Sequence, residues 1–311
     1  MMQLESTVKY DSKERHLLDW GLNRFVDDRM RIGHTSIGGS VERLPSQSLS
    51  QLKPTDRILQ FGNPWVSKTP SERRFNHPDT VIPRVSNYYF WDNPELPHLL
   101  YKDAWNPHGH KNWMRLVPGG ILSGRCDVRQ ERVLAINDQI RYHSDGKHMN
   151  WQSIVPKRRR VEVRGKRVLL ILSSNGVYKH YDNLDKWQWA EQVQRILEAR
   201  GYTVEVRDKM GRARRRRQQE RLSDVLHDTD WAFSVSYQSA AVMESLLAGT
   251  AAVTWNRRDC GGWLTTPWQE MLEGNIRHNW RTLDVDLRVE QILSNTFHKQ
   301  EAYTGEWYYG Q

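Results

Sequence analysis

The sequence predicts an α/β fold with a parallel, doubly wound sheet in its carboxyl-terminal half. Three short strand-like runs support this prediction, and they occupy residues 167–174, 202–207 and 231–236. Helix-like or basic stretches separate the runs, and strands that alternate with helices at this spacing form parallel sheets. The third run is the clearest, because a hydroxyl-rich turn, a helix and another short apolar strand follow it before residue 255.

The amino-terminal half shows less regular patterning. Residues 12–30 carry apolar side chains every three or four positions, which predicts a helix. Residues 56–62 and 80–85 predict short strands. Residues 86–120 are irregular and aromatic, and a long segment without periodicity is typical of a functional surface.

The carboxyl-terminal half contains clearer helix signals. An amphipathic helix is predicted over 184–200 and ends before Gly201, and a basic helix is predicted over 212–227. The helix after residue 239 is rich in alanine, and Gly249 stands where a C-cap glycine belongs. Residues 264–300 are predicted to be helical.

The length of 311 residues allows two domains. The composition changes near residue 151, where a short segment followed by a basic run indicates an interdomain connection. We therefore expect a first domain over 1–155 and a second over 156–300. The aromatic tail, 301–311, is expected to pack back on the first domain.

The net charge of +9 is concentrated in two segments. Residues 157–167 hold seven cations against one acid, and residues 207–221 hold eight against two, so the rest of the chain is slightly acidic. Clustered positive charge is typical of a polyanionic partner, nucleic acid above all. The alternative is a pair of solvated basic faces without a partner. The candidate nucleic-acid contacts are Lys157, Arg158, Arg159, Arg160, Arg214, Arg215, Arg216 and Arg217.

The remaining composition excludes several classes of protein. Cys126 and Cys260 are too far apart in sequence to suggest a disulfide framework or a metal site. His108 and His110 form a pair without further ligands nearby, so no metal is expected. No apolar run is long enough to span a membrane, and the first residues lack a signal pattern, so we expect a cytoplasmic protein.

Polar side chains follow each of the three predicted strands. Because the carboxyl ends of parallel strands share one edge of a sheet, and ligands of doubly wound sheets bind there, we expect these side chains to surround an anionic ligand such as a nucleoside diphosphate. Glu244 would bind a sugar or ribose hydroxyl, unless it only caps the helix or pairs internally. Arg207 and Lys209 would offset the charge of the leaving diphosphate, unless they belong to the basic face. The full candidate set is Ser173, Ser174, Asn175, Arg207, Lys209, Ser236, Tyr237, Ser239, Ala240 and Glu244.

A family resemblance appears in this last βαβ unit. The helix resembles the motif S-A-A-x-x-E-A-L-x-A-G-x-P-V of the donor-binding domain of GT-B glycosyltransferases, although Thr250-Ala251 replaces the usual small-Pro pair. The matching residues are Ser239, Ala240, Ala241, Glu244, Leu246, Leu247, Ala248 and Gly249. The resemblance covers residues 165–260. It implies two Rossmann-like domains facing a central cleft, and a nucleotide-sugar, most often a UDP-sugar, as co-substrate rather than a tightly bound cofactor.

An inverting sugar transfer needs a general base, which the first domain would supply. Asp92 is the first candidate, because its aromatic neighbours could raise its pKa and offer a stacking platform. Asp103 and Asp127 compete with it, and an Asx turn before Pro94 is the structural alternative. His34 lies in a glycine-rich loop that could reach the cleft or could simply be exposed.

These features together predict a glycosyltransferase, and specifically a hexosyltransferase. The basic segments and the aromatic residues of 86–113 favour DNA as the acceptor, with a hydroxymethylated pyrimidine such as hydroxymethylcytosine, as in the DNA glucosyltransferases of bacteriophages. One alternative is a glycosyltransferase for a cell-surface or small-molecule acceptor, whose cationic patches would meet anionic lipids. Another is a non-enzymatic nucleic-acid-binding protein on a degenerate GT-B scaffold.

Overall fold

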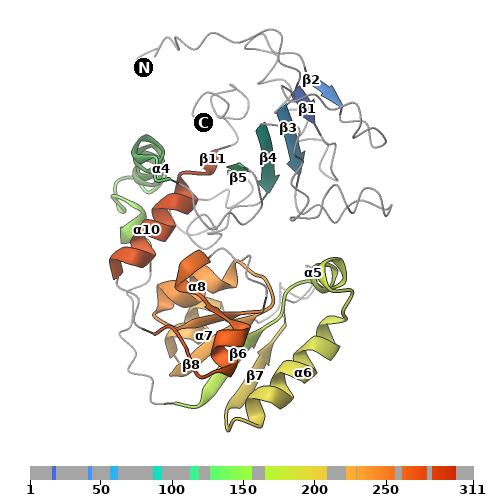
Figure 1. Ribbon diagram of the computed structural model, residues 1–311. Helices are drawn as coiled ribbons and strands as arrows, with labels where there is room; N and C mark the ends of the chain where they lie inside the picture. Colours follow the sequence, from blue (N-terminus) through green and yellow to red (C-terminus); the bar gives the residue numbers. More distant parts are fainter. Residues whose placement is uncertain are drawn as a thin grey trace, which may run out of the picture. The chain divides into compact units, whose positions relative to one another are not determined.

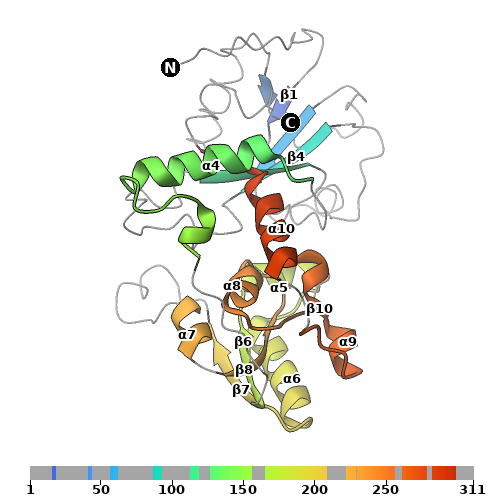
Figure 2. The ribbon, with the colours of Figure 1, turned by 90° about the vertical axis from the view of Figure 1, so that its left-hand side faces the viewer.

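The chain divides into two compact units (Figures 1 and 2). Unit 1 comprises Met1–Pro94, His108–Ile121 and Asn295–Gln311, and unit 2 comprises Glu95–Pro107 and Leu122–Ser294. The computed structural model describes residues 16–18, 41–43, 57–61, 87–92, 113–118, 127–155, 165–208, 222–228, 230–255, 261–278 and 282–298. Residues 122–155 group with unit 2, and the domain division expected after residue 155 stays a prediction. The tail, 301–311, lies outside the described residues.

The described strands of unit 1 form a mixed sheet in the order β11-β5-β4-β3-β1-β2. The strands β2, β1, β3 and β4 run parallel, whereas β5 is antiparallel to both β4 and β11. Their bounds are His16–Leu18 (β1), Val41–Arg43 (β2), Arg57–Phe61 (β3), Asn87–Asp92 (β4), Trp113–Pro118 (β5) and Thr296–His298 (β11). The sheet therefore combines chain segments from near both ends of the sequence.

The structure corrects two expectations for unit 1. Residues 16–18 form a strand rather than part of a helix, because a short apolar run does not by itself distinguish a buried strand from a helix. The aromatic stretch 86–120 contains β4 and β5 and is therefore not wholly irregular. The strand expected over 56–62 is confirmed as β3, and the one expected over 80–85 lies outside the described residues.

Unit 2 is built on a parallel sheet with the strand order β10-β9-β8-β6-β7. The bounds are Arg167–Ile171 (β6), Thr203–Arg207 (β7), Trp231–Ser236 (β8), Ala252–Thr254 (β9) and Thr266–Pro267 (β10). The three strands expected from the strand-like runs are confirmed, as is the short strand after the alanine-rich helix. An irregularity between Arg167 and Val168 shifts the register of β6 against β8.

Helices cover both faces of this sheet, because the residues of β6 are apolar on both sides. On one face, Val168 and Leu170 pack with α6 (Lys186–Glu198) and α9 (Trp268–Leu272). On the other face, Leu169 and Ile171 pack with α7 (Leu222–Asp228) and α8 (Ala241–Ala248). The result is a three-layer α/β/α arrangement (Figure 1).

The ends of two helices follow local rules. The N-cap residue of α6 is Asp185, whose side chain accepts a hydrogen bond from the backbone N–H of Trp187 at 2.8 Å. The helix buries Trp189, Val193 and Leu197, which recur at helical spacing. The helix α8 ends at Gly249, whose φ of 85° is left-handed, so the predicted C-cap is confirmed.

Further helices were not predicted from the sequence. They are α4 (Gln130–His143), α5 (Asn175–Tyr181) and two 3-10 turns, η4 (Trp151–Ser153) and η5 (Gly262–Leu264). The helix α10 (Thr282–Leu293) packs on α4, and the backbone N–H of Arg129 donates to Ser294 Oγ at 2.8 Å. The stretch 264–300 is therefore only partly helical, because β10 and β11 lie within it.

Candidate functional site

The topology of the unit 2 sheet identifies one edge as the place for a ligand. The chain passes from β6 to β7 on one side and then returns to place β8 on the other side of β6. The strand order therefore reverses between β6 and β8. In doubly wound sheets, ligands bind at the carboxyl ends of the strands on either side of this switch point.

The loops that follow β6 and β8 are joined at this switch point. Ser173, two residues beyond β6, donates a hydrogen bond from its Oγ to the backbone carbonyl of Gln238 at 2.5 Å. Its backbone N–H donates to the hydroxyl of Tyr178 at 3.0 Å. Ser173 is only 5% exposed, so both bonds are shielded from solvent. These two hydrogen bonds hold the loops after β6 and β8, which lie on either side of the switch point.

The end of β7 lies at the same edge. Ile171 in β6 is level with both Arg207 in β7 and Ser236 in β8, and the N–H of Leu172 donates to the carbonyl of Arg207 at 2.9 Å. The three strand ends singled out from the sequence therefore converge, as the parallel order requires. Arg207 is half-buried, and Lys209 lies outside the described residues.

A partly buried ion pair joins the end of β7 to the start of α6. Lys186 Nζ lies 2.6 Å from Asp208 Oδ1, with side-chain exposures of 15% and 30%. The backbone N–H of Lys186 also donates to Asn175 Oδ1 at 3.2 Å, so the side chain of Asn175 contributes to positioning this turn. Sequence reasoning missed Lys186, although its place at the first position of a helix after the first strand could have indicated it.

Two buried hydroxyls at this edge have no hydrogen-bond partner among the residues that the structure describes. They are Ser236 Oγ and Thr254 Oγ1, which belong to residues in register on β8 and β9. Two residues earlier on the same face of β8, Ser234 Oγ donates to Ser245 Oγ of α8 at 2.8 Å. Native structures pair nearly all buried polar groups, so these hydroxyls need an explanation, and a ligand bound at this edge would supply one. Thr254 carries no motif signal and was missed from the sequence.

The helix α8 begins directly after β8 at this edge. Ser239 Oγ accepts a hydrogen bond from the N–H of Ala241 at 3.2 Å, and Ser239 and Ala240 are half-buried. Glu244, also half-buried, lies in the first turn. The small side chains at this helix start let a ligand approach backbone N–H groups, and the helix dipole favours an anion there.

The side chains of Tyr237 and Tyr178 make contacts within the fold. The hydroxyl of Tyr237 donates to the carboxylate of Asp182, and both Tyr237 and Tyr178 are fully buried in the aromatic cluster with Trp189. Burial raises the pKa of Tyr178, so its hydroxyl stays neutral at physiological pH. Ser174 is exposed and precedes α5 without a side-chain cap bond.

The structure describes few of the remaining candidates, which are the possible general bases and the basic residues. Asp92 is the last residue of β4 and is in register with Arg115 of β5. Asp127 is exposed and belongs to unit 2, and its role as a base stays a prediction. The remaining candidates lie outside the described residues, and they are His34, Asp103, Lys157–Arg160 and Arg214–Arg217.

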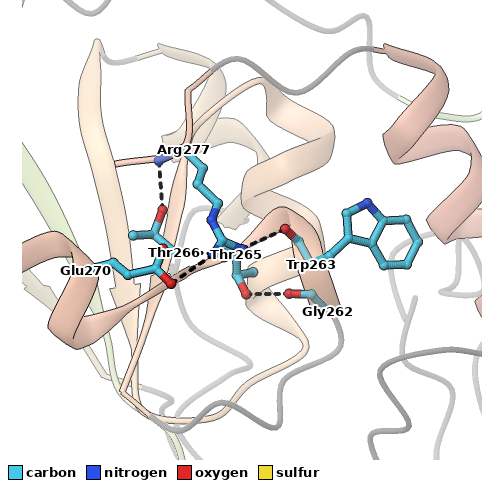
Figure 3. Close-up of polar contacts among 6 residues, drawn as sticks. All are labelled: Gly262, Trp263, Thr265, Thr266, Glu270 and Arg277. Atoms are coloured by element: carbon cyan, nitrogen blue, oxygen red, sulfur yellow. Dashed lines mark hydrogen bonds and ion pairs between the residues drawn. The ribbon is translucent and has the colours of Figure 1, made fainter. Parts of the chain in front are cut away.

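A cluster around Arg277 fixes the segment that follows β9 (Figure 3). Its guanidinium group donates to the carbonyls of Trp263 and Thr265 at 2.9 and 2.8 Å and forms a two-bond ion pair with Glu270. Its backbone N–H donates to Thr266 Oγ1 at 2.9 Å. One arginine therefore joins η5, β10 and α9.

Among the residues that the structure describes, no three His, Cys, Asp or Glu side chains gather so that they could hold a metal ion. Within the same residues, no helix has the length and apolar character needed to cross a membrane.

Comparison with known proteins gives matches among solved structures alone. No protein family model matches the chain, and no curated protein matches it. One solved structure that is similar is described as Thermosulfurimonas dismutans KpsC, beta Kdo 2,7 transferase, with 12% identity, a TM-score of 0.48 and coverage of 96% of this chain and 100% of that chain. Another is described as the beta Kdo 2,4 transferase of the same KpsC, with 14% identity, a TM-score of 0.46 and coverage of 93% of each chain.

Proposed function

We propose that the protein is a glycosyltransferase that binds a nucleotide-sugar at the carboxyl edge of the unit 2 sheet. The observation that supports this most directly is the pair of buried, unpaired hydroxyls beside the switch point, at Ser236 and Thr254. They lie where doubly wound sheets bind phosphorylated ligands. The resemblance of the following helix to the donor-binding motif of GT-B enzymes supports the same proposal.

Each group at the edge suits a part of such a donor. The hydroxyls of Ser236 and Thr254 and the N–H groups at the start of α8 would hold phosphate oxygens. Glu244 would accept hydrogen bonds from sugar or ribose hydroxyls. Lys186 and Arg207 would stabilise the charge that develops on the leaving phosphate, which is an electrostatic contribution of the kind that often dominates catalysis.

We propose a cell-surface or small-molecule hydroxyl compound as the acceptor, and Asp92 as the base that activates it. The described residues of this edge include the partly buried pair of Lys186 with Asp208 and the exposed ring of Trp187, and such groups suit a carbohydrate. DNA with a hydroxymethylated pyrimidine is the second candidate acceptor, favoured by the two basic segments of the sequence.

A donor panel tests the first part of the proposal. Purified protein is titrated by calorimetry with UDP-glucose, other UDP-hexoses and CMP-Kdo, and each donor's hydrolysis or transfer is followed by release of the free nucleotide. We expect at least one donor to bind and turn over in the wild type. The Glu244→Gln variant should keep its fold and lose turnover. Absence of both binding and turnover across the panel would overturn the proposal.

The dependence on salt distinguishes the two acceptors. Each phosphate contact with DNA releases counterions, so DNA binding through several contacts falls by orders of magnitude when salt is raised about fourfold. Binding of an uncharged carbohydrate acceptor should change little over the same range. Tight binding to hydroxymethylated DNA with a steep loss in salt would therefore favour the DNA acceptor over the proposed one.

A further inference from the structure

An exposed tryptophan lies at the same edge of the unit 2 sheet. Trp187 is the second residue of α6, and it is 52% exposed. Its neighbour Lys186 is paired with Asp208, the first residue after β7. Because β7 ends at the candidate donor site, this ion pair holds the first turn of α6, and Trp187 with it, beside that site.

Two contacts position Trp187. Its backbone N–H donates to Asp185 Oδ1 at 2.8 Å, and Lys186 Nζ lies 4.8 Å from the centroid of its ring. The first contact anchors the backbone and the second limits the motion of the ring, so the ring loses less conformational freedom on binding than a wholly free side chain.

The packing of α6 does not account for this side chain. The helix faces the sheet with Trp189, which is fully buried, whereas Trp187 projects from the other side of the same turn. Large exposed aromatic side chains next to polar groups are typical of binding sites, because they offer apolar contact area with few rotatable bonds.

We propose that Trp187 is a stacking surface for a sugar ring. One face of a pyranose carries mainly C–H groups and can lie flat on an indole ring, and its hydroxyls can donate to Asp208 and accept from Lys186. This inference rests on the proposed glycosyltransferase function and specifies how that site recognises carbohydrate. The pyranose that stacks on Trp187 could belong to the donor sugar or to a saccharide acceptor, and the experiment separates these two sources.

The test compares two substitutions of Trp187 with a matched control. Trp187→Ala removes the ring, and Trp187→Phe keeps a smaller one. Trp263→Ala is the control, because Trp263 is also a partly exposed tryptophan of unit 2, at 38%, and lies near a cation, 5.9 Å from the guanidinium carbon of Arg288. Thermal melting shows that each variant is folded.

Calorimetry with UDP against UDP-glucose, and with CMP against CMP-Kdo, measures the contribution of the donor sugar. A glycan array measures saccharide binding without nucleotide. Loss of one aromatic stacking contact should weaken sugar binding about threefold to tenfold in Trp187→Ala, and less in Trp187→Phe. Trp263→Ala should bind like the wild type.

The pattern of losses decides the outcome. If Trp187→Ala binds nucleotide-sugars more weakly but nucleotides equally well, Trp187 stacks on the donor sugar. If the variant binds saccharides on the array more weakly, Trp187 stacks on the acceptor. An equal loss for nucleotides and nucleotide-sugars would show that Trp187 stacks on the base, and unchanged binding would show that it contacts no ligand. Either result overturns this inference and leaves the glycosyltransferase proposal standing. A wild type that binds neither nucleotide-sugar nor glycan overturns both.

Discussion

Replacing Ser236 with alanine should stabilise the protein and weaken donor binding at the same time. Ser236 is 2% exposed, and its hydroxyl has no partner within the structure. A hydroxyl in this state destabilises the fold, and a ligand bound at this edge would supply its missing partner. Opposite effects on stability and binding would therefore identify it as a functional hydroxyl.

The size of both effects follows from the energetics of hydrogen bonds. Burying a hydroxyl without a partner costs about 1–3 kcal/mol, so Ser236→Ala should raise the free energy of unfolding by about 1 kcal/mol. A hydrogen bond to a charged phosphate contributes about 1.5–3 kcal/mol, so donor affinity should fall by at least about tenfold. Thr254→Val should act in the same two directions, because its hydroxyl is also unpaired.

A neighbouring serine provides the control. Ser234 lies on the same strand and is equally buried, but its Oγ is bonded to Ser245 Oγ at 2.8 Å. Ser234→Ala should therefore lower stability by about 1 kcal/mol and leave donor binding unchanged. Urea unfolding followed by tryptophan fluorescence measures stability, and calorimetry measures binding of the donor that the panel identifies.

Two results would refute the reasoning. A loss of stability in Ser236→Ala as large as that in Ser234→Ala would show that the hydroxyl of Ser236 already has a partner. Donor binding that is the same in Ser236→Ala and wild type would show that the hydroxyl does not face the ligand.

Three other substitutions test the framework of unit 2. Tyr178→Phe removes the acceptor for the buried N–H of Ser173 and should cost about 1–3 kcal/mol of unfolding free energy; an unchanged urea midpoint would contradict this. Gly249→Ala places a side chain at a φ of 85° and should cost about 1 kcal/mol, which thermal melting can detect, whereas Gly249→Asn should cost less. Arg277→Ala removes two bonds to backbone carbonyls and the pair with Glu270, but both side chains are about 40% exposed, so a loss of only about 1–2 kcal/mol in urea unfolding is expected.

The sequence predicted the helices and strands of unit 2 better than those of unit 1, because the apolar residues of unit 2 follow clearer periodic patterns. The strands β6 and β8 are largely apolar, as is typical of parallel sheets with both faces covered. Each is followed by helix signals with recognisable ends such as Asp185 and Gly249. In unit 1 the strand β1 has only three residues, and its apolar pattern fits a helix as well as a strand. The helix α4 was missed although Val133, Ile136 and Ile140 recur at helical spacing and are buried.

The candidate site was predicted only in part for a related reason. Residues that come soon after a predicted strand, such as Ser173, could be assigned to the ligand edge, because parallel strands end at the same edge of a sheet. Lys186 reaches the same edge through an ion pair with Asp208, and such a long-range contact has no local signal. The unpaired state of Ser236 could not be predicted either, because it depends on the absence of a partner among side chains from other elements.

The sequence by itself determined that one half of the chain alternates strands and helices, that the runs of β6 and β8 are largely apolar, and that polar side chains follow the strands. Local patterning is sufficient for this, because periodicity, caps and turn residues act over a few positions. The tertiary structure alone decided the strand order β10-β9-β8-β6-β7 and hence the switch point between β6 and β8. It also decided which hydroxyls are left unpaired and which tryptophan of α6 is exposed, since both depend on the packing of residues that are distant in the chain.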